Sequence, residues 1–141
     1  SACAWNACEF DASMEQKADV VIADLPCSGL GIIGRKPDIK YNASMDGIRD
    51  LAALQRQMLS VVWQYVKPGG VLVYSTCTVN RLENDENRAR FLNEYPFEPV
   101  DISGRLGIDF QEDSLKEGYI QLYPGVHPCD GFFISVMKRK G

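Results

Sequence analysis

Two short strand patterns, separated by one long helix pattern, place the tightest limit on the fold. Residues 19–24 form a run rich in Val and Ile, which we expect to be a strand buried on both faces. Residues 71–76 form a second buried strand. Between them, apolar side chains recur at three- and four-residue steps over 45–66, Ser44 is a suitable N-cap, and Lys67-Pro68-Gly69-Gly70 is a stop signal. Strand, helix and strand in this order predict the α/β class with a parallel core.

The second half of the chain adds a shorter helix pattern and further strand patterns. We expect a helix over 83–95, with Asn80 as its N-cap and Glu83 completing a capping box. Strands are expected over 98–102, 119–122 and 132–138, and the last of them is predicted to pair antiparallel with its neighbours. The chain shows no internal repeat.

Reactive side chains follow the first two predicted strands. Asp24 ends one strand, Cys27 comes shortly after it, and Cys77 directly follows the other strand. Ligands of parallel sheets bind beyond the carboxyl ends of the strands, so we expect all three at a functional site. Residues 29–34 match G-x-G-x-x-G, but they neither follow the strand directly nor open an amphipathic helix. We interpret them as a flexible loop beside a site, where glycine permits close backbone approach.

Composition excludes several classes of protein. With 141 residues, 45% hydrophobic and 24% charged, the chain suits one globular domain. No apolar run is long enough for a membrane span, and the first residues lack the pattern of a signal peptide. The five cysteines are odd in number and contain no C-x-x-C pair. This argues against a disulfide framework or a zinc ribbon, predicts no metal, and favours a reducing cytoplasm.

The net charge and the local distribution of charge point in opposite directions on nucleic-acid binding. The formal net charge of −4 argues mildly against it, because phosphate contacts need Lys and Arg. Charge acts locally, however, and residues 32–41 contain Arg35, Lys36 and Lys40 with only Asp38 as an acidic partner. We therefore treat Lys36 and Lys40 as candidate contacts to a phosphate backbone.

Two segments together are distinctive. They are Asp24-Leu25-Pro26-Cys27-Ser28-Gly29 and Tyr74-Ser75-Thr76-Cys77-Thr78. They resemble motifs IV and VI of the RNA cytosine-5 methyltransferases of the Nop/Sun family, and most of all the bacterial Sun or Fmu type, which acts on 16S ribosomal RNA. The resemblance extends over nearly the whole chain, from about Asp11 to Lys140. Further matching segments are Arg35 to Tyr41, the helix that contains Gln55, Lys67 to Gly70, Glu83-Asn84 and Asp130 to Phe133.

The resemblance assigns a chemical role to each reactive side chain. Cytosine carbon 5 is a weak nucleophile, and adding a thiolate at carbon 6 activates it toward the methyl sulfonium. The resemblance implies that Cys77 is this nucleophile, which requires a thiol with a lowered pKa. Asp24 is then the acid beside ring nitrogen 3, and Cys27 assists release of the product.

The resemblance also implies the binding partners. The cofactor is S-adenosyl-L-methionine, with Asp11, Asp24 and Pro26 as candidate cofactor-binding residues. RNA is the substrate, with 16S ribosomal RNA favoured, and Lys36 and Lys40 are the candidate RNA contacts. Neither a membrane nor a metal is expected as a partner.

The resemblance implies that residues 1–141 are only the second half of a Rossmann-like class I methyltransferase sheet, with parallel strands and an antiparallel last strand. The glycine-rich cofactor loop of the family has no match here, so we expect it upstream of Ser1. The first residues include no initiator Met, which agrees with a piece of a longer protein. We therefore expect this chain alone to have little or no activity and to leave an exposed parallel edge that favours dimerisation or aggregation.

Two other functions compete with this one. A DNA cytosine-5 methyltransferase uses the proline-cysteine thiol as nucleophile, which here is Cys27, but the second thiol motif at Thr76-Cys77-Thr78 argues against it. Alternatively, the chain is a non-catalytic half-domain that contacts RNA. The sequence leaves the target nucleotide and the oligomeric state open.

Overall fold

The computed structural model describes residues 2–39, 43–106 and 112–141. The described residues form a five-stranded mixed sheet with two α-helices. The strands are β1 (Ala18–Asp24), β2 (Val66–Thr76), β3 (Phe97–Pro99), β4 (Tyr119–Leu122) and β5 (Phe132–Arg139). The helices are α2 (Met45–Val62) and α3 (Asp85–Glu94), with short 3-10 turns η1 (Ala12–Met14), η2 (Leu30–Ile32), η3 (Trp63–Tyr65) and η4 (Asp113–Leu115).

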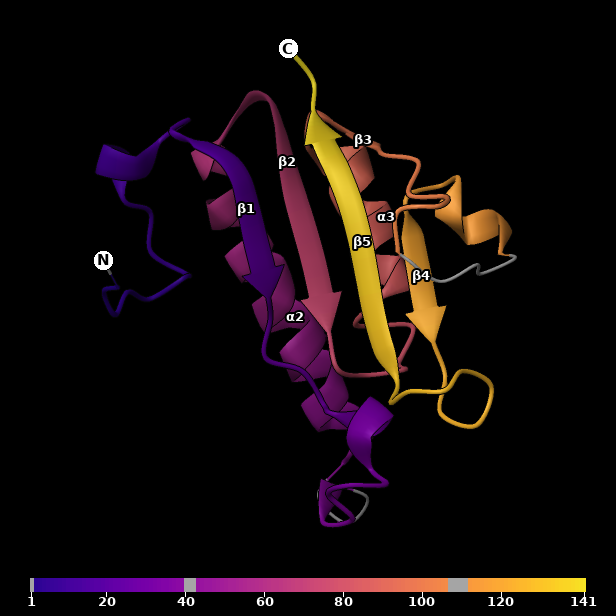
Figure 1. The fold of residues 1–141 in the computed structure, drawn as a ribbon. Coiled ribbons are helices and arrows are strands. Elements are labelled where there is room, and N and C mark those ends of the chain that lie inside the picture. Colours follow the sequence, from indigo (N-terminus) through magenta and orange to yellow (C-terminus); the bar gives the residue numbers. More distant parts are fainter. Residues whose placement is uncertain (1, 40–42, 107–111) are drawn as a thin grey trace.

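The sheet has parallel strands at one side and an antiparallel strand within it. β1 and β2 are parallel, and β5 is antiparallel to β2, to β3 and to β4. β5 therefore runs against all the other strands, while β3 and β4 share its far edge (Figure 1). The α/β class and the antiparallel last strand agree with the prediction. The third predicted strand is shorter than expected, and it does not extend a continuous parallel core because β5 lies between it and β2.

The prediction that the first strand is buried on both faces is wrong. Val20 and Ile22, on one face of β1, are 56% and 72% exposed, whereas Ala23 on the other face is buried. α2 and α3 both lie behind the sheet in Figure 1, so only one face of β1 is covered by a helix. β1 is also the edge strand of the described sheet, which agrees with the expected exposed parallel edge.

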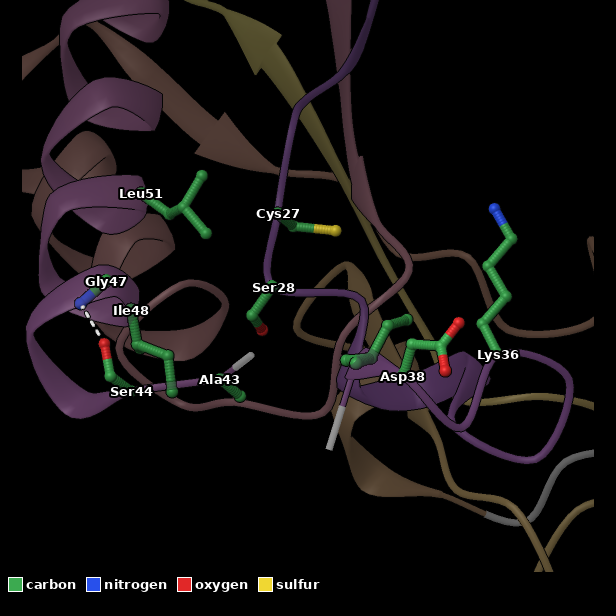
Figure 2. A pocket seen from close by; sticks show the side chains of 10 residues that line it. Cys27, Ser28, Lys36, Asp38, Ala43, Ser44, Gly47, Ile48 and Leu51 are labelled. Atoms are coloured by element: carbon green, nitrogen blue, oxygen red, sulfur yellow. Dashed lines mark hydrogen bonds between the residues drawn. The ribbon is translucent and has the colours of Figure 1, made fainter. Parts of the chain in front are cut away.

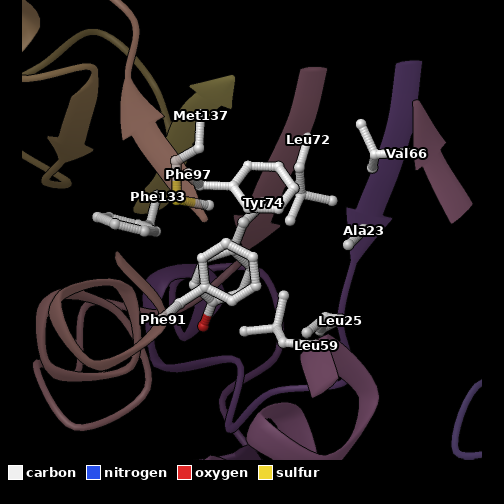
Figure 3. Packing of buried hydrophobic residues seen from close by; sticks show 10 residues of the cluster. All are labelled: Ala23, Leu25, Leu59, Val66, Leu72, Tyr74, Phe91, Phe97, Phe133 and Met137. Atoms are coloured by element: carbon white, nitrogen blue, oxygen red, sulfur yellow. The ribbon is translucent and has the colours of Figure 1, made fainter. Parts of the chain in front are cut away.

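The covered face of the sheet carries the main core (Figure 3). Leu59 of α2 and Phe91 of α3 pack against Tyr74 of β2 and Phe133 of β5, and each of these side chains is at most 2% exposed. The Tyr74 and Phe133 rings meet edge to face at 5.7 Å. This core packs β2 against both helices, and β5 pairs with β2 along its length. The end of β2 is therefore held rigidly, and it supports Cys77, the residue that follows it.

The predicted end of the α2 helix needs correction. The α2 helix ends at Val62, earlier than Lys67-Pro68-Gly69-Gly70, which belongs to β2. These residues still loop out, because Ala18 pairs with Val66 whereas Val20 pairs with Val71. Ser44 caps α2 as predicted, accepting the Gly47 N–H at 3.1 Å.

The predicted capping box at the start of α3 is also wrong. The N-cap is Asn84, and Asn80 instead accepts the N–H of Leu82. Glu83 is fully buried, and its carboxylate accepts hydrogen bonds from residues of other elements. The local pattern N-x-x-E therefore serves here for tertiary contacts and not for a cap.

Among the described helices, none combines the length and the apolar character that a membrane span needs.

Candidate functional site

The two motif cysteines meet at the carboxyl ends of neighbouring parallel strands. Cys27 lies in the segment after β1, Cys77 directly follows β2, and their Sγ atoms are 3.2 Å apart. Both side chains are partly exposed, and both are free thiols. We expect the two thiols to share one site because the sequence predicts that these two strands are parallel. The register that pairs Asp24 of β1 with Ser75 of β2 shows this parallel pairing.

The Cys27 thiol holds its proton strongly. Burial, and next the hydrogen bond with Cys77, raise the pKa of Cys27 to about 12. The two sulfur atoms lie within hydrogen-bonding distance of each other, and either thiol can be the donor. A Cys27 thiol that keeps its proton is in place to donate a hydrogen bond to the Cys77 sulfur.

The raised pKa makes a prediction for alkylation. At pH 8 a thiol of pKa about 12 is about 0.01% thiolate, against about 25% for an ordinary cysteine. Iodoacetamide should therefore modify Cys27 far more slowly than the exposed Cys3 and Cys129, with a rate that keeps rising above pH 10. Peptide mass spectrometry over pH 7–11 measures this, and a Cys27 rate that reaches a plateau near pH 9 contradicts it.

The three residues predicted to bind the cofactor lie at different places along the chain. Asp24 ends β1, is exposed, and accepts the hydroxyl hydrogen of Ser75 at 2.9 Å. Asp11 caps η1, where its side chain accepts the Ser13 N–H. Hydrogen bonding by the Ser13 side chain, and next by the Ser13 N–H, lowers the pKa of the Asp11 carboxyl. Pro26 is exposed, and its carbonyl accepts the Gln55 side-chain amide at 2.9 Å.

A cavity of about 470 Å³ opens beside Cys27 (Figure 2). One wall is the start of α2, with Ile48 and Leu51, and the other wall includes Lys36 and Asp38. Lys36 is exposed and lines the same cavity as Cys27, which places one predicted RNA contact at this cavity. The second, Lys40, falls outside the described residues.

At the G-x-G-x-x-G segment, residues 29–34, the backbone passes close to the backbones of Cys77 and Gly131. The Gly31 N–H donates to the Cys77 carbonyl at 3.1 Å, and the Gly131 N–H donates to the Gly31 carbonyl at 2.8 Å. A Cβ on Gly31 would lie 2.1 Å from the Gly131 carbonyl oxygen, so only glycine fits there. This agrees with the interpretation of the segment as a loop in close approach to a site.

Sequence reasoning missed a buried polar network behind the two thiols. Glu83, Asn84 and Gln55 are all fully buried and hydrogen-bonded to the cysteine-bearing segments. Runs of apolar residues indicate a core, but nothing local in the sequence shows that a polar residue on a helix or in a turn points inward. The described residues contain no cluster of three or more His, Cys, Asp or Glu that could hold a metal ion.

Comparisons with known proteins identify the family. The family model described as 16S rRNA methyltransferase RsmB/F matches residues 3–138. A probable ribosomal RNA small subunit methyltransferase B of Bacillus subtilis (strain 168) is 42% identical over 128 residues, which are 89% of this chain and 28% of that protein. This chain thus spans little more than a quarter of the length of that relative.

Solved structures agree with this assignment. The crystal structure of PH0851 has a TM-score of 0.78 and 34% identity, covering 89% of this chain and 27% of that one. NSun6 from Pyrococcus horikoshii, solved with SFG, has a TM-score of 0.70 and 26% identity, covering 85% of this chain and 29% of that one. With the sheet, the paired thiols and the family model in agreement, this chain belongs to the 16S rRNA methyltransferase RsmB/F family.

Proposed function

We propose that the protein carrying this chain transfers a methyl group from S-adenosylmethionine to carbon 5 of cytosine in small-subunit ribosomal RNA, through a covalent adduct with Cys77. The observation that carries the proposal is the 3.2 Å contact between Cys77 and Cys27. One thiol is needed to attack the ring and a second to assist release, and both must reach the same base. The relatives, named as rRNA small subunit methyltransferases, support rRNA as the substrate class.

The proposed reaction uses Cys77 first. Its thiolate adds to carbon 6 of the ring, the electrons of the carbon 5–carbon 6 double bond move into the ring, and carbon 5 becomes nucleophilic. Asp24, in its protonated form, would donate a hydrogen bond or a proton at nitrogen 3 as negative charge builds there. S-adenosylmethionine, when bound, supplies the methyl group that carbon 5 takes.

Release then needs a base for the carbon 5 proton. Once Cys77 is a thioether, its sulfur is a much poorer acceptor for the Cys27 proton, so one cause of the raised pKa of Cys27 is weakened. This favours the Cys27 thiolate, whose sulfur takes the carbon 5 proton. The electrons of that carbon–hydrogen bond re-form the ring double bond, and the bond from carbon 6 to sulfur breaks with its electron pair returning to Cys77.

The residues at the end of β1 suit a cofactor that carries a positive sulfonium. Asp24 offers an exposed carboxylate at the carboxyl end of a parallel strand. We assign Asp24 and Pro26 to the cofactor site, with Asp11 as a further contact. The SFG in the NSun6 structure, an analogue of S-adenosylmethionine, supports this cofactor. We further propose that this chain is the C-terminal part of a methyltransferase domain and acts in the cytoplasm.

Lys36 gives a test of the RNA contact. Lys36→Ala removes one cation from the rim of the cavity. We expect weaker RNA binding and a shallower dependence of log Kd on log salt, by about 0.7 for one contact to a single strand. Fluorescence anisotropy between 50 and 200 mM salt measures both. Lys116→Ala, at an exposed lysine after η4, should change neither, and an unchanged salt slope in Lys36→Ala argues against the contact.

The reaction itself is tested by the identity of the modified base. A polypeptide of the relatives' full length that carries this chain is incubated with methyl-labelled S-adenosylmethionine and, in parallel reactions, with unmodified small-subunit rRNA or with DNA. Nucleoside mass spectrometry should find the label in 5-methylcytidine. Label only in DNA cytosine would favour the DNA enzyme, and RNA binding without label in any nucleoside would favour the non-catalytic half-domain.

A further inference from the structure

Two adjacent buried residues link the segments that carry the two thiols. Glu83 and Asn84 lie in the turn between β2 and α3, and both side chains are fully buried. The hydroxyl of Tyr74 donates to the backbone carbonyl of Glu83, which ties this turn to the core. The side chain of Glu83 contacts the Cys27 segment and that of Asn84 contacts the Cys77 segment.

Glu83 holds the residue after Cys27. Its Oε1 atom accepts the Ser28 backbone N–H at 2.8 Å, and its Oε2 atom accepts the Ser28 hydroxyl at 2.6 Å. Gln55 completes this arrangement by donating to Oε1 of Glu83 at 3.1 Å and to the Pro26 carbonyl at 2.9 Å. The backbone is thus held immediately before and immediately after Cys27.

Asn84 does the same for Cys77. Its Oδ1 atom accepts the Thr76 hydroxyl at 2.6 Å, and its Nδ2 atom donates to the Thr78 carbonyl at 3.0 Å. The same Nδ2 donates to the Gln121 side chain at 2.6 Å, which links the turn to β4. The residues on both sides of Cys77 are therefore fixed by one amide.

A hydroxyl contact joins the two halves. The Ser28 hydroxyl has one hydrogen, and it donates that hydrogen to Glu83. The Thr78 hydroxyl, 2.8 Å away, is then the donor to the Ser28 oxygen. The residue after Cys77 thus bonds to the residue after Cys27, and both depend on the Glu83 carboxylate.

A fully buried carboxylate is costly unless donors surround it. Among the described residues no Lys or Arg pairs with Glu83, so its hydrogen bonds to Ser28 and Gln55 carry the compensation. What the carboxylate adds is a fixed direction for each donor, and these donors set where Cys27 lies.

We propose that Glu83 and Asn84 are positioning residues that hold the Cys27 and Cys77 sulfur atoms in contact, Glu83 acting on Cys27 and Asn84 on Cys77. The positioning of the two sulfur atoms is argued from this hydrogen-bond network alone, whereas its consequence for catalysis rests on the proposed function. Neither residue is required to touch the base. Each acts through the backbone on either side of one thiol.

The geometric part is tested without RNA. Phenylarsine oxide bridges two thiols only when they lie close together, forming two arsenic–sulfur bonds and releasing one water. In a polypeptide of the relatives' full length, Glu83→Gln and Asn84→Asp should each slow bridging of Cys27 to Cys77 by about tenfold or more, since a shift of about 1 Å costs up to ~100-fold in such reactions. Peptide mass spectrometry measures the rate. Glu86→Gln and Asn93→Asp, at exposed positions of α3, are matched controls and should react like wild type.

The consequence for catalysis is a split between two steps. With RNA that contains cytidine, Glu83→Gln should form the Cys77 adduct at a near-normal rate but release it about tenfold more slowly, because Cys27 is misplaced. Asn84→Asp should instead slow formation of the adduct. A loss of folded protein alone would lower both steps in parallel, so the split separates positioning from stability.

The possible failures are distinguishable. Wild-type bridging rates in both variants would overturn the proposal, whatever the activity. Absence of any RNA adduct in the wild type would overturn the proposed function and leave the bridging test in force. If Glu83→Gln does not fold, Ser28→Ala decides, because it removes only the hydroxyl between Thr78 and Glu83. Slower bridging in Ser28→Ala supports the proposal, and wild-type bridging in both Ser28→Ala and Asn84→Asp overturns it.

Discussion

Cys77→Ala should abolish the covalent complex with RNA that contains 5-fluorocytidine, whereas Cys27→Ala should retain it. Fluorine cannot leave carbon 5 as a proton does, so an adduct formed by Cys77 persists after methyl transfer. The proposed difference follows from the thiol pair: the raised pKa of Cys27 keeps that thiol protonated and makes it a poor nucleophile, while Cys77 lies 3.2 Å away at the same site. Denaturing gels of the full-length protein with this RNA and S-adenosylmethionine measure the adduct, with the exposed Cys129→Ala as the control.

The same variants separate in turnover on ordinary RNA. Loss of the nucleophile should lower methyl transfer by at least about 10⁴-fold, as for other enzymes with a covalent step. Cys27→Ala should also lower turnover, but it should accumulate an adduct, because the step that stalls is release. An adduct lost only in Cys27→Ala would reverse the two roles and point to the chemistry of DNA cytosine-5 methyltransferases.

The placement of these thiols was predictable from the sequence because it depends on few elements. A run of β-branched residues, a helix of about five turns and a second such run lead to two parallel strands, whose carboxyl ends must meet. Asp24, Cys27 and Cys77 follow those runs, so their proximity needs no knowledge of the rest of the sheet. The separation of the sulfur atoms, 3.2 Å, was not predictable, because residues distant in the sequence set it.

Contacts between distant segments explain the errors. An apolar run such as 19–24 suits a strand buried on one face or on both, and only the neighbouring elements decide which. Here the described helices cover one face alone, so Ile22 is exposed. Glu83 was interpreted as part of a cap because N-x-x-E is a common local pattern, yet Ser28, 55 residues away, is its partner. The β3–β5 pairing is likewise decided between distant segments.

Gly31→Ala should be among the most damaging single changes to this site that leave every functional side chain in place. A Cβ at Gly31 would lie 2.1 Å from the Gly131 carbonyl oxygen and 2.9 Å from the Cys77 carbonyl oxygen. Both are backbone atoms, so neither can rotate away, and the Gly31 loop must separate from Gly131 and from Cys77. Overpacking of this kind costs about 1–3 kcal/mol or more in the free energy of unfolding. The shift should also slow arsenical bridging of Cys27 and Cys77.

Gly34→Ala provides the matched control within the same loop. A Cβ at Gly34 has no atom within 4 Å, so we expect a change in stability of no more than about 0.5 kcal/mol and an unchanged bridging rate. Thermal or urea unfolding of the two variants measures the difference in stability. Equal stability and equal bridging rates in Gly31→Ala and Gly34→Ala would mean that the Gly31 and Gly131 backbones can separate without moving Cys77. A loss confined to Gly31→Ala would show that the glycine-rich segment holds the Cys77 backbone.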